Sequence, residues 1–241
     1  MLTSSCALSC KTIRRRKNVT GGQSMQKKIQ LKSKVLSKND RIAEEIRSRL
    51  QAAGIWSINL IGSPGSGKTT LLEAVFTQRD DSSGAAVIEG DVKTDNDTRR
   101  ILALGVPSVQ IQTNGACHLQ AEQVQAELAN VPLDDINLLV VENVGNLICP
   151  VAYDLGENCR AVVLSVTEGE DKPLKYPSAF FSADVMVITK VDLAPYVDVQ
   201  PQKLKTYALS INPKLDIFIT SAKTGEGIGQ FTDFLFHNGR Q

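Results

Sequence analysis

GSPGSGKTT, at residues 62–70, is the most informative segment of the sequence for the fold. It matches the pattern G-x-x-x-x-G-K-S/T, follows an apolar run at residues 55–61 and precedes the helical stretch TLLEAVF at residues 70–76. A strand, a glycine-rich loop and a helix in this order form a phosphate-binding loop, whose backbone N–H groups surround the phosphate oxygens. The helix also directs the positive end of its dipole toward the anion. The sequence therefore predicts a nucleotide-binding site here.

Individual positions of this loop have separate expected roles. Lys68 is expected to reach the β- and γ-phosphates, and the Thr69 hydroxyl is expected to ligate Mg²⁺. The residues expected to bind the nucleotide in this segment are Gly62, Gly65, Ser66, Gly67, Lys68, Thr69 and Thr70.

Six further apolar runs follow the loop, each with the length of a buried strand. They are AAVIEG (85–90), SVQIQ (108–112), INLLVVEN (136–143), RAVVLSV (160–166), ADVMVITK (183–190) and LDIFIT (215–220). Helices are expected between them, at residues 119–128, 197–210 and 228–236. Nearly continuous apolar strands alternating with helices indicate a parallel sheet. The expected fold is α/β, a P-loop NTPase with a mostly parallel sheet flanked by helices on both faces, of the SIMIBI-like G-domain kind.

The segment before the first strand contains one regular helix. Ile42, Ile46 and Leu50 recur every four residues, which predicts an amphipathic helix. Ser37 or Asn39 is expected to cap its start, and Gly54, at the other end, to stop it. The GTPase-like domain is therefore expected to span residues 37–241.

Residues 1–36 form a separate, basic extension in this prediction. Residues 1–39 contain no Asp or Glu, whereas Lys and Arg are frequent there. One interpretation is a disordered arm or an organellar transit segment, since these are Arg- and Ser-rich and poor in acidic residues. The other is a misassigned translation start, with the true start at Met25.

The overall composition limits the possible partners and location. The chain has 241 residues and a net charge of +1, which gives no electrostatic argument for nucleic acid or an anionic membrane. No apolar run approaches the roughly 18 residues that span a bilayer. Five cysteines are an odd number, which favours reduced thiols or metal ligands over a disulfide framework. A cytoplasmic location is the default expectation.

Two elements at consecutive strand ends indicate guanine recognition. TKVD at residues 189–192 resembles the N-K-x-D element, in which a carboxylate at the Asp192 position accepts from guanine N1–H and the exocyclic amine. The Lys190 stem is expected to lie on the base. TSAKTG at residues 220–225 resembles the S-A-K element, which places Ser221, Ala222 and Lys223 at the base. Thr189 departs from the usual Asn, so we expect it to brace the loop only in part and to weaken base discrimination.

Acidic residues after two strands suggest the Mg²⁺ side of the site. In VVENVGN, Glu142 stands where related proteins carry an acid followed by D-x-x-G, and Gly145 is the glycine expected to meet the γ-phosphate. Asp91 is the candidate for a second carboxylate on the Mg²⁺ side. Asp95 and Asp97 are expected to belong to a solvated acidic loop with a helix cap. The predicted catalytic residues are thus Lys68, Asp91, Glu142 and Gly145, and the predicted Mg²⁺ ligands are Thr69, Asp91 and Glu142.

Three residues suggest a second metal site. Cys117 and His118 are adjacent in a Gly-containing loop that opens a predicted helix, and Cys149 follows Gly145 by four residues. Thiolate and imidazole suit both Zn²⁺ and Ni²⁺, and this donor set does not rank the two ions. Cys159 is expected to be a small core residue instead.

Taken together, these motifs resemble the HypB-type GTPases that serve nickel insertion into nickel–iron hydrogenase. The resemblance covers essentially residues 25–241, and the matching stretches are GSPGSGKTTLLE, IEGDVKTDND, GACHL, VVENVGNLICP, SVTEGEDKPLKYP and TKVDLAPYVD. It implies a homodimer in which Cys117, His118 and Cys149 bind nickel or zinc at the subunit interface. It also implies a HypA-type nickel chaperone and a hydrogenase large-subunit precursor as partners. Intrinsic GTP turnover is expected to be slow, because no catalytic Gln or arginine finger is evident; Lys172 or Lys175 acting across the dimer stays open.

The N-terminus of this sequence differs from that of many HypB-type proteins. Only Cys6 and Cys10 stand where many members carry a Cys-rich or His-rich metal site, so we do not expect a second nickel site or a storage role.

Three other protein classes are alternatives to this resemblance. A urease-type accessory GTPase would show Cys-Pro-His, whereas Val151 follows Cys149 and Pro150 here. A P-loop kinase of a small metabolite would need an acceptor base and an arginine lid. A metal-buffering protein would bind nucleotide without using it.

Overall fold

The computed structural model describes residues 21–79, 84–91 and 96–239, with side chains from residue 34 onward. The chain divides into two units, Met1–Val35 and Leu36–Gln241, and the second unit contains the sheet and both candidate sites. The expectations for residues 1–20, including Cys6 and Cys10, and for Asp95 fall outside the described residues.

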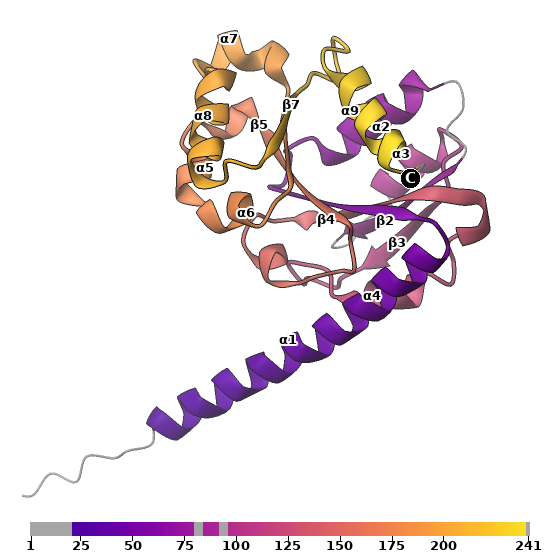
Figure 1. The fold of residues 1–241 in the computed structure, drawn as a ribbon. Helices are drawn as coiled ribbons and strands as arrows, with labels where there is room; N and C mark the ends of the chain where they lie inside the picture. The colour runs from indigo at the N-terminus through magenta and orange to yellow at the C-terminus, as the bar shows by residue number, and fades with distance from the viewer. Residues whose placement is uncertain (1–20, 80–83, 92–95, 240–241) are drawn as a thin grey trace, which may run out of the picture. The chain divides into compact units, whose positions relative to one another are not determined.

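A seven-stranded sheet forms the centre of the second unit (Figure 1). Its strands are β1 (Trp56–Gly62), β2 (Gly84–Asp91), β3 (Ser108–Gln112), β4 (Ile136–Gly145), β5 (Cys159–Ser165), β6 (Val185–Thr189) and β7 (Asp216–Ile219). Their order is β3-β2-β4-β1-β5-β6-β7, and every neighbouring pair is parallel. All seven predicted strands are present, and the predicted α/β class is confirmed.

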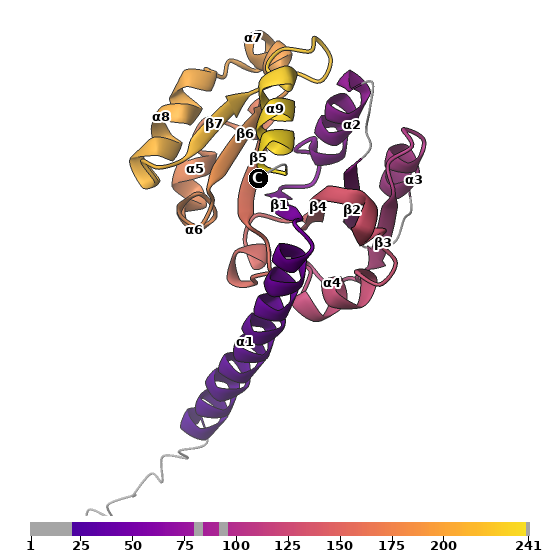
Figure 2. The same cartoon turned by 45° about the vertical axis from the view of Figure 1, so that its right-hand side comes forward.

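Alternate strand residues point to opposite sides of the sheet, and both sets are largely apolar, so helices of the second unit, including the part of α1 from Leu36 onward, cover both faces. They are α1 (Gly21–Ala52), α2 (Lys68–Gln78), α3 (Asn96–Leu102), α4 (Ala121–Glu127), α5 (Lys172–Lys175), α6 (Pro177–Phe181), α7 (Ala194–Val197), α8 (Pro201–Ile211) and α9 (Ile228–Asn238). Leu60 lies in a core with side chains of α2, α3 and α9, whereas its neighbour Ile61 lies in another core with α6 and α8. Figure 2 shows α2 and α9 side by side on their face of the sheet.

The start of α1 differs from the prediction. The helix begins at Gly21 and passes through Ser37 and Asn39, so neither residue is its N-cap. The segment contains no proline and many good helix formers, such as Lys, Gln and Leu, and nothing in it ends a helix. The Asn39 side chain instead bridges other elements: it donates to the Asp154 carbonyl at 2.8 Å and accepts from the Ala121 N–H at 2.9 Å.

The helix stop at Gly54 was predicted correctly. Gly54 has a φ of +68°, and α1 ends two residues earlier. The predicted helix at residues 197–210, in contrast, is wrong at its start. Asp198 adopts a left-handed conformation with a φ of +51°, which ends α7, and α8 begins at Pro201, a favoured first helical residue.

No helix within the described residues is both long enough and apolar enough to span a membrane.

Candidate functional site

The phosphate-binding loop connects β1 to α2, as predicted. β1 ends at Gly62 and α2 begins at Lys68, so the loop runs between the central strand and a helix N-terminus. Gly67 precedes the helix with a φ of +93°, a conformation that strains any residue with a Cβ atom. Lys68 and Thr69 are both buried at the base of the loop.

Residues at the carboxyl ends of β2 and β4 and in the segments that follow β1 and β6 line one cavity of about 470 Å³. Parallel strands bring their carboxyl ends to the same edge, which is where ligands bind in such sheets. The predicted residues that line this cavity are Gly65, Gly67, Lys68, Thr69, Thr70, Asp91, Glu142, Gly145 and Lys190. Residues from four separate parts of the sequence therefore meet at one site.

The acidic side of the cavity fits a hard divalent cation. The Thr69 hydroxyl donates to Glu142 Oε1 at 2.9 Å. Glu142 Oε2 is buried without a hydrogen-bond partner, and so is Glu89 Oε1. Unsatisfied buried carboxylate oxygens are costly, and an oxygen-only donor set is what Mg²⁺ prefers. Thr69, Glu142 and Asp91, which lines the same cavity, are the residues that would hold Mg²⁺; when bound, that ion would neutralise charge on the phosphates.

Glu89 is a cavity residue that the sequence analysis missed. It pairs directly with Glu142 across β2 and β4, and it is only 2% exposed. Burial, followed by the negative charge of Glu142, raises the pKa of Glu89; burial also raises the pKa of Glu142, against the opposing effect of Lys68. The sequence does show Glu89 as a charged residue within the apolar run at 85–90. Its pairing with Glu142 on the neighbouring strand could not be read from the sequence.

The Glu89→Gln variant is expected to change how stability depends on pH. The folded-state pKa of Glu89 lies above its unfolded value, so wild-type stability falls as pH rises between those two values. Glutamine does not titrate, so the variant lacks this decrease in stability. Without nucleotide or Mg²⁺, we expect its unfolding free energy to rise relative to that of wild type by about 1 kcal/mol or more as the pH goes from 5.5 to 8. Thermal unfolding of both proteins at the two pH values measures this, and parallel curves would contradict the assignment.

Asp97 was expected in a solvated acidic loop with a helix cap. It does lie at a helix start, in the first turn of α3, but it also lines the nucleotide cavity, which was not expected. Its carboxylate accepts from Arg100 Nη1 at 2.9 Å, and Arg100 lines the cavity as well. The two residues therefore place a neutralised ion pair beside the carboxylates.

The two predicted guanine elements lie together at the ends of β6 and β7. Ser221 Oγ donates to Asp192 Oδ1 at 2.6 Å, which fixes the carboxylate expected to read the base. The Val191 N–H donates to the Thr220 carbonyl at 3.2 Å and joins the two backbones. Ala222 and Lys223 are exposed beyond Ser221.

Thr189 braces the phosphate-binding loop directly. Its hydroxyl donates to the Ser66 carbonyl at 2.6 Å, and the neighbouring Lys190 Nζ donates to the Gly65 carbonyl at 2.7 Å. The hydroxyl thus reaches the loop that an Asn amide was expected to brace, and it does so from a buried position.

Thr189→Val is therefore expected to weaken nucleotide binding. The substitution keeps the side-chain shape but leaves the buried Ser66 carbonyl without its hydrogen-bond donor. An unsatisfied buried carbonyl of this kind destabilises the loop conformation by about 1–3 kcal/mol. We expect GTP and GDP affinity to fall together by about tenfold. Titration with fluorescent nucleotides measures this, with Thr189→Ser as the matched control that keeps the hydroxyl. If the valine variant binds like wild type, Thr189 is not a brace.

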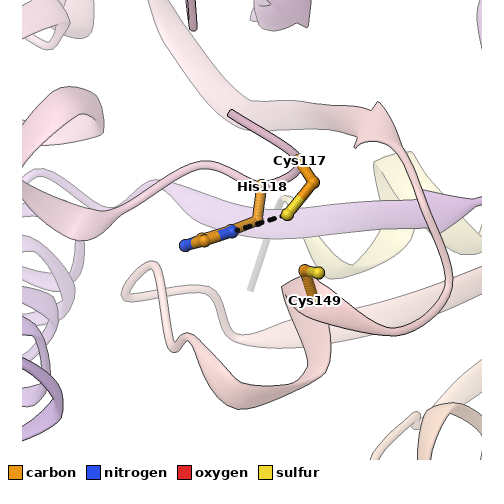
Figure 3. Close-up of side chains that lie close together, drawn as sticks. All are labelled: Cys117, His118 and Cys149. Atoms are coloured by element: carbon orange, nitrogen blue, oxygen red, sulfur yellow. Dashed lines mark hydrogen bonds between the residues drawn. The ribbon is translucent and has the colours of Figure 1, made fainter. Parts of the chain in front are cut away.

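Cys117, His118 and Cys149 form a second cluster (Figure 3). Cys117 and His118 lie in the loop between β3 and α4, and Cys149 begins the short helical turn Cys149–Ala152. Their candidate donor atoms all lie within 4.8 Å of one another, although 30 residues lie between His118 and Cys149 in the sequence. The structure thus brings together the three residues that the sequence proposed as a metal site.

The chemistry of this cluster suits a borderline-soft ion. A side-chain hydrogen bond with Cys149 raises the pKa of Cys117. Burial lowers the pKa of His118, which favours the neutral imidazole. His118 Nδ1 lies 3.5 Å from Cys117 Sγ, while Nε2 is buried without a partner. Two thiols and a neutral imidazole match Zn²⁺ and Ni²⁺, and three ligands leave a coordination position open.

Tyr153 is a neighbour that the sequence did not indicate. Its ring stacks on His118 with 3.9 Å between centroids and an interplanar angle of 26°. This stacking orients the imidazole. Cys159, in contrast, is 5% exposed and lies in the core beneath α2 and α9, which confirms its predicted structural role.

Lys172 and Lys175 do not line the nucleotide cavity. Lys172 pairs with Glu168 at 3.1 Å and Lys175 with Asp171 at 2.6 Å. Whether either lysine acts across a dimer stays a prediction.

A backbone contact joins the two sites. Gly145 pairs with Gly62, and a Cβ atom at Gly145 would lie only 3.0 Å from Pro64 in the phosphate-binding loop. Cys149 follows Gly145 by four residues. The segment that packs on the phosphate loop therefore also carries a candidate metal ligand.

Comparisons with known proteins show which family this chain resembles. Residues 57–219 match the model of the CobW/HypB/UreG nucleotide-binding domain. The hydrogenase maturation factor HypB of Escherichia coli is 46% identical over 214 residues, which cover 89% of this chain and 74% of that protein. Two crystal structures also align, each with a TM-score of 0.79 over 84% of this chain. HypB from Archaeoglobus fulgidus is 40% identical with 99% of its chain covered, and HypB from Helicobacter pylori in complex with nickel is 37% identical with 95% covered. The protein therefore belongs to the CobW/HypB/UreG family of nucleotide-binding proteins, and within that family to the HypB group.

Proposed function

We propose that this protein hydrolyses GTP and uses the nucleotide state to gate delivery of nickel during maturation of a nickel–iron hydrogenase. The observation that carries the proposal is the continuous segment from Glu142 to Cys149. Its first residue faces the cation side of the nucleotide cavity, Gly145 packs on the phosphate-binding loop, and its last residue belongs to the thiol cluster. A change at the γ-phosphate can therefore reach a metal ligand without crossing a domain boundary.

In this proposal the residues divide the work of GTP hydrolysis. Lys68 and the N–H groups of the phosphate-binding loop hold the β- and γ-phosphates, and Asp192 reads the base. Water attacks the γ-phosphorus, the bond to the β-phosphate oxygen breaks, and GDP and phosphate leave. Loss of the γ-phosphate removes the partner of the Gly145 N–H and frees its segment to shift.

Slow intrinsic turnover is part of the proposal. Arg100 is the arginine that lines the cavity among the described residues, and Asp97 and Glu73 already neutralise it. Without a free arginine or a Gln at the phosphates, the largest electrostatic contribution to catalysis is missing. We therefore expect a second copy of the chain or a partner to set the rate.

The thiol cluster supports the proposal that the protein carries nickel and releases it. A site with two thiols, one imidazole and an open position binds Ni²⁺ or Zn²⁺ and can release it, which suits a carrier better than a structural ion. The homodimer with metal at its interface, a HypA-type donor and the hydrogenase precursor belong to the same proposal. So does the cytoplasm as its location.

Nucleotide preference and metal dependence test the proposal together. Phosphate release from GTP and from ATP is measured with and without Ni²⁺, alongside oligomeric state by light scattering. We expect GTP to be preferred and turnover to respond to the metal. Preference for ATP with metal-independent transfer to a metabolite would favour a kinase, and metal binding without any turnover would favour a metal buffer.

Urease maturation is the second candidate for the enzyme served. The Helicobacter pylori relative, 37% identical over 220 residues, is described as a hydrogenase/urease maturation factor. The Cys149-Pro150-Val151 sequence lacks the histidine of the urease-type proteins. Deleting the gene and assaying hydrogenase and urease separately in the same cells decides between the two.

A further inference from the structure

Asn146 lies between the two sites, one residue after Gly145 and three before Cys149. It is half-buried, and its side-chain amide joins both segments that carry the thiols. Nδ2 donates to the Cys117 carbonyl at 3.2 Å, while Oδ1 accepts from the Ile148 N–H at 2.8 Å. A single amide therefore holds the backbone of one cysteine and the residue just before the other.

The backbone of Asn146 is tied to the phosphate-binding loop. It forms an isolated antiparallel bridge with Gly62, the last residue of β1 and the first of the glycine loop. The preceding Gly145 is in close contact with Pro64 of the same loop. A shift of the phosphate loop therefore acts on Asn146 through both its own backbone and its neighbour.

A second asparagine holds the far side of the Cys117–His118 loop in a different way. Asn143 is 1% exposed, and its Oδ1 accepts from the N–H groups of Leu119 and Val144. Its Nδ2 donates to Asn59 on β1 at 3.2 Å, so it is fixed within the sheet. Asn143 anchors the loop after His118, whereas Asn146 holds the loop at Cys117 from a segment that follows the sheet.

We propose that Asn146 is the positioning residue that couples nucleotide state to metal geometry. The inference rests on the proposed function, because it assigns a residue to the coupling required there. In one nucleotide state the amide spans Cys117 and Ile148 and keeps the two thiols facing each other. Movement of Gly145 in the other state draws the amide away from the Cys117 carbonyl, and the distance between the thiols changes.

Two variants of Asn146 and one control test this role. Asn146→Ala removes both hydrogen bonds, and Asn146→Asp keeps the acceptor for Ile148 but loses the donor to Cys117. Asn130→Ala is the control, because Asn130 is an exposed asparagine whose amide contacts Glu127 on α4. Ni²⁺ and Zn²⁺ affinities are measured for each protein with GDP and with a non-hydrolysable GTP analogue, and nucleotide affinity is measured separately.

In wild type and Asn130→Ala we expect metal affinity to differ between the two nucleotides by about tenfold, which is within the usual range of coupling. In Asn146→Ala the ratio should fall to within about twofold, while nucleotide affinity stays within about threefold of wild type. Asn146→Asp should lose most of the ratio too. Full coupling in Asn146→Ala would overturn this inference alone, whereas absence of coupling in wild type would overturn it together with the proposed function.

A metal-free readout covers the case in which the variants bind metal too weakly to titrate. The rates at which Cys117 and Cys149 react with an alkylating reagent are measured by peptide mass spectrometry in both nucleotide states. In wild type we expect the two rates to depend on the nucleotide, and in Asn146→Ala we expect them not to. Equal nucleotide dependence in both proteins would contradict the role of Asn146.

Discussion

Lys68→Ala is expected to lower GTP turnover by more than about a hundredfold while leaving the thiol cluster able to bind metal. Lys68 is buried at the start of α2 and lines the nucleotide cavity. Its ammonium is the charge expected to reach the β- and γ-phosphates, and removing one such preorganised group typically lowers the rate by two to three orders of magnitude. The cluster of Cys117, His118 and Cys149 contains no atom of this residue.

Phosphate release under saturating GTP measures the first effect, and a competition titration with a chromogenic zinc chelator measures the second. Lys214→Ala is the matched control, since Lys214 is exposed and does not line the cavity. Turnover within tenfold of wild type in Lys68→Ala would remove the phosphate-binding loop from the catalytic account.

Cys149→Ala is expected to have the second large effect, a loss of metal affinity of about a hundredfold or more. Loss of residues that only orient metal ligands already costs about 10- to 100-fold, and Cys149 is itself a candidate ligand. The remaining Cys117 and His118 would form an incomplete site. The same change should remove the dependence of metal affinity on nucleotide, because the cluster then has no ligand on the segment after Gly145.

Cys159→Ala provides a thiol control with the opposite outcome. Cys159 lies in the core, so its loss should reduce the unfolding free energy by about 1 kcal/mol or more and leave metal affinity unchanged. Metal titration and thermal unfolding of both variants distinguish the two cysteines. If Cys149→Ala titrates nickel and zinc as wild type does, the metal site has been assigned to the wrong residues.

The inner strands were predictable from the sequence because burial on both faces makes them continuous apolar runs. INLLVVEN at residues 136–143 is such a run, and β4 is buried along nearly all of its length. The short helices α5 and α6 were not predictable in the same way. They span four and five residues, which is too few for helical periodicity to appear.

Site residues were predictable where the chemistry lies in a contiguous motif. Lys68 and Thr69 belong to the glycine loop, and the resemblance to HypB-type proteins indicated Cys117, His118 and Cys149. Glu89, Tyr153 and Asn146 were missed because their roles depend on three-dimensional neighbours. Glu89 pairs with Glu142 on the neighbouring strand, and Tyr153 stacks on His118. Asn146 donates a hydrogen bond to the backbone carbonyl of Cys117. Local sequence patterns do not show which residues pair across neighbouring strands or which loops come into contact.

Coupling between nucleotide and metal is tested by comparing one preparation of the protein in two nucleotide states. Ni²⁺ affinity is measured by titration, and the coordination shell is measured by X-ray absorption, with GDP and with a non-hydrolysable GTP analogue. We expect the Ni²⁺ affinity to differ by about tenfold and the number or length of nickel–sulfur bonds to change with the nucleotide. Identical affinity and an identical coordination shell in the two states would contradict this coupling.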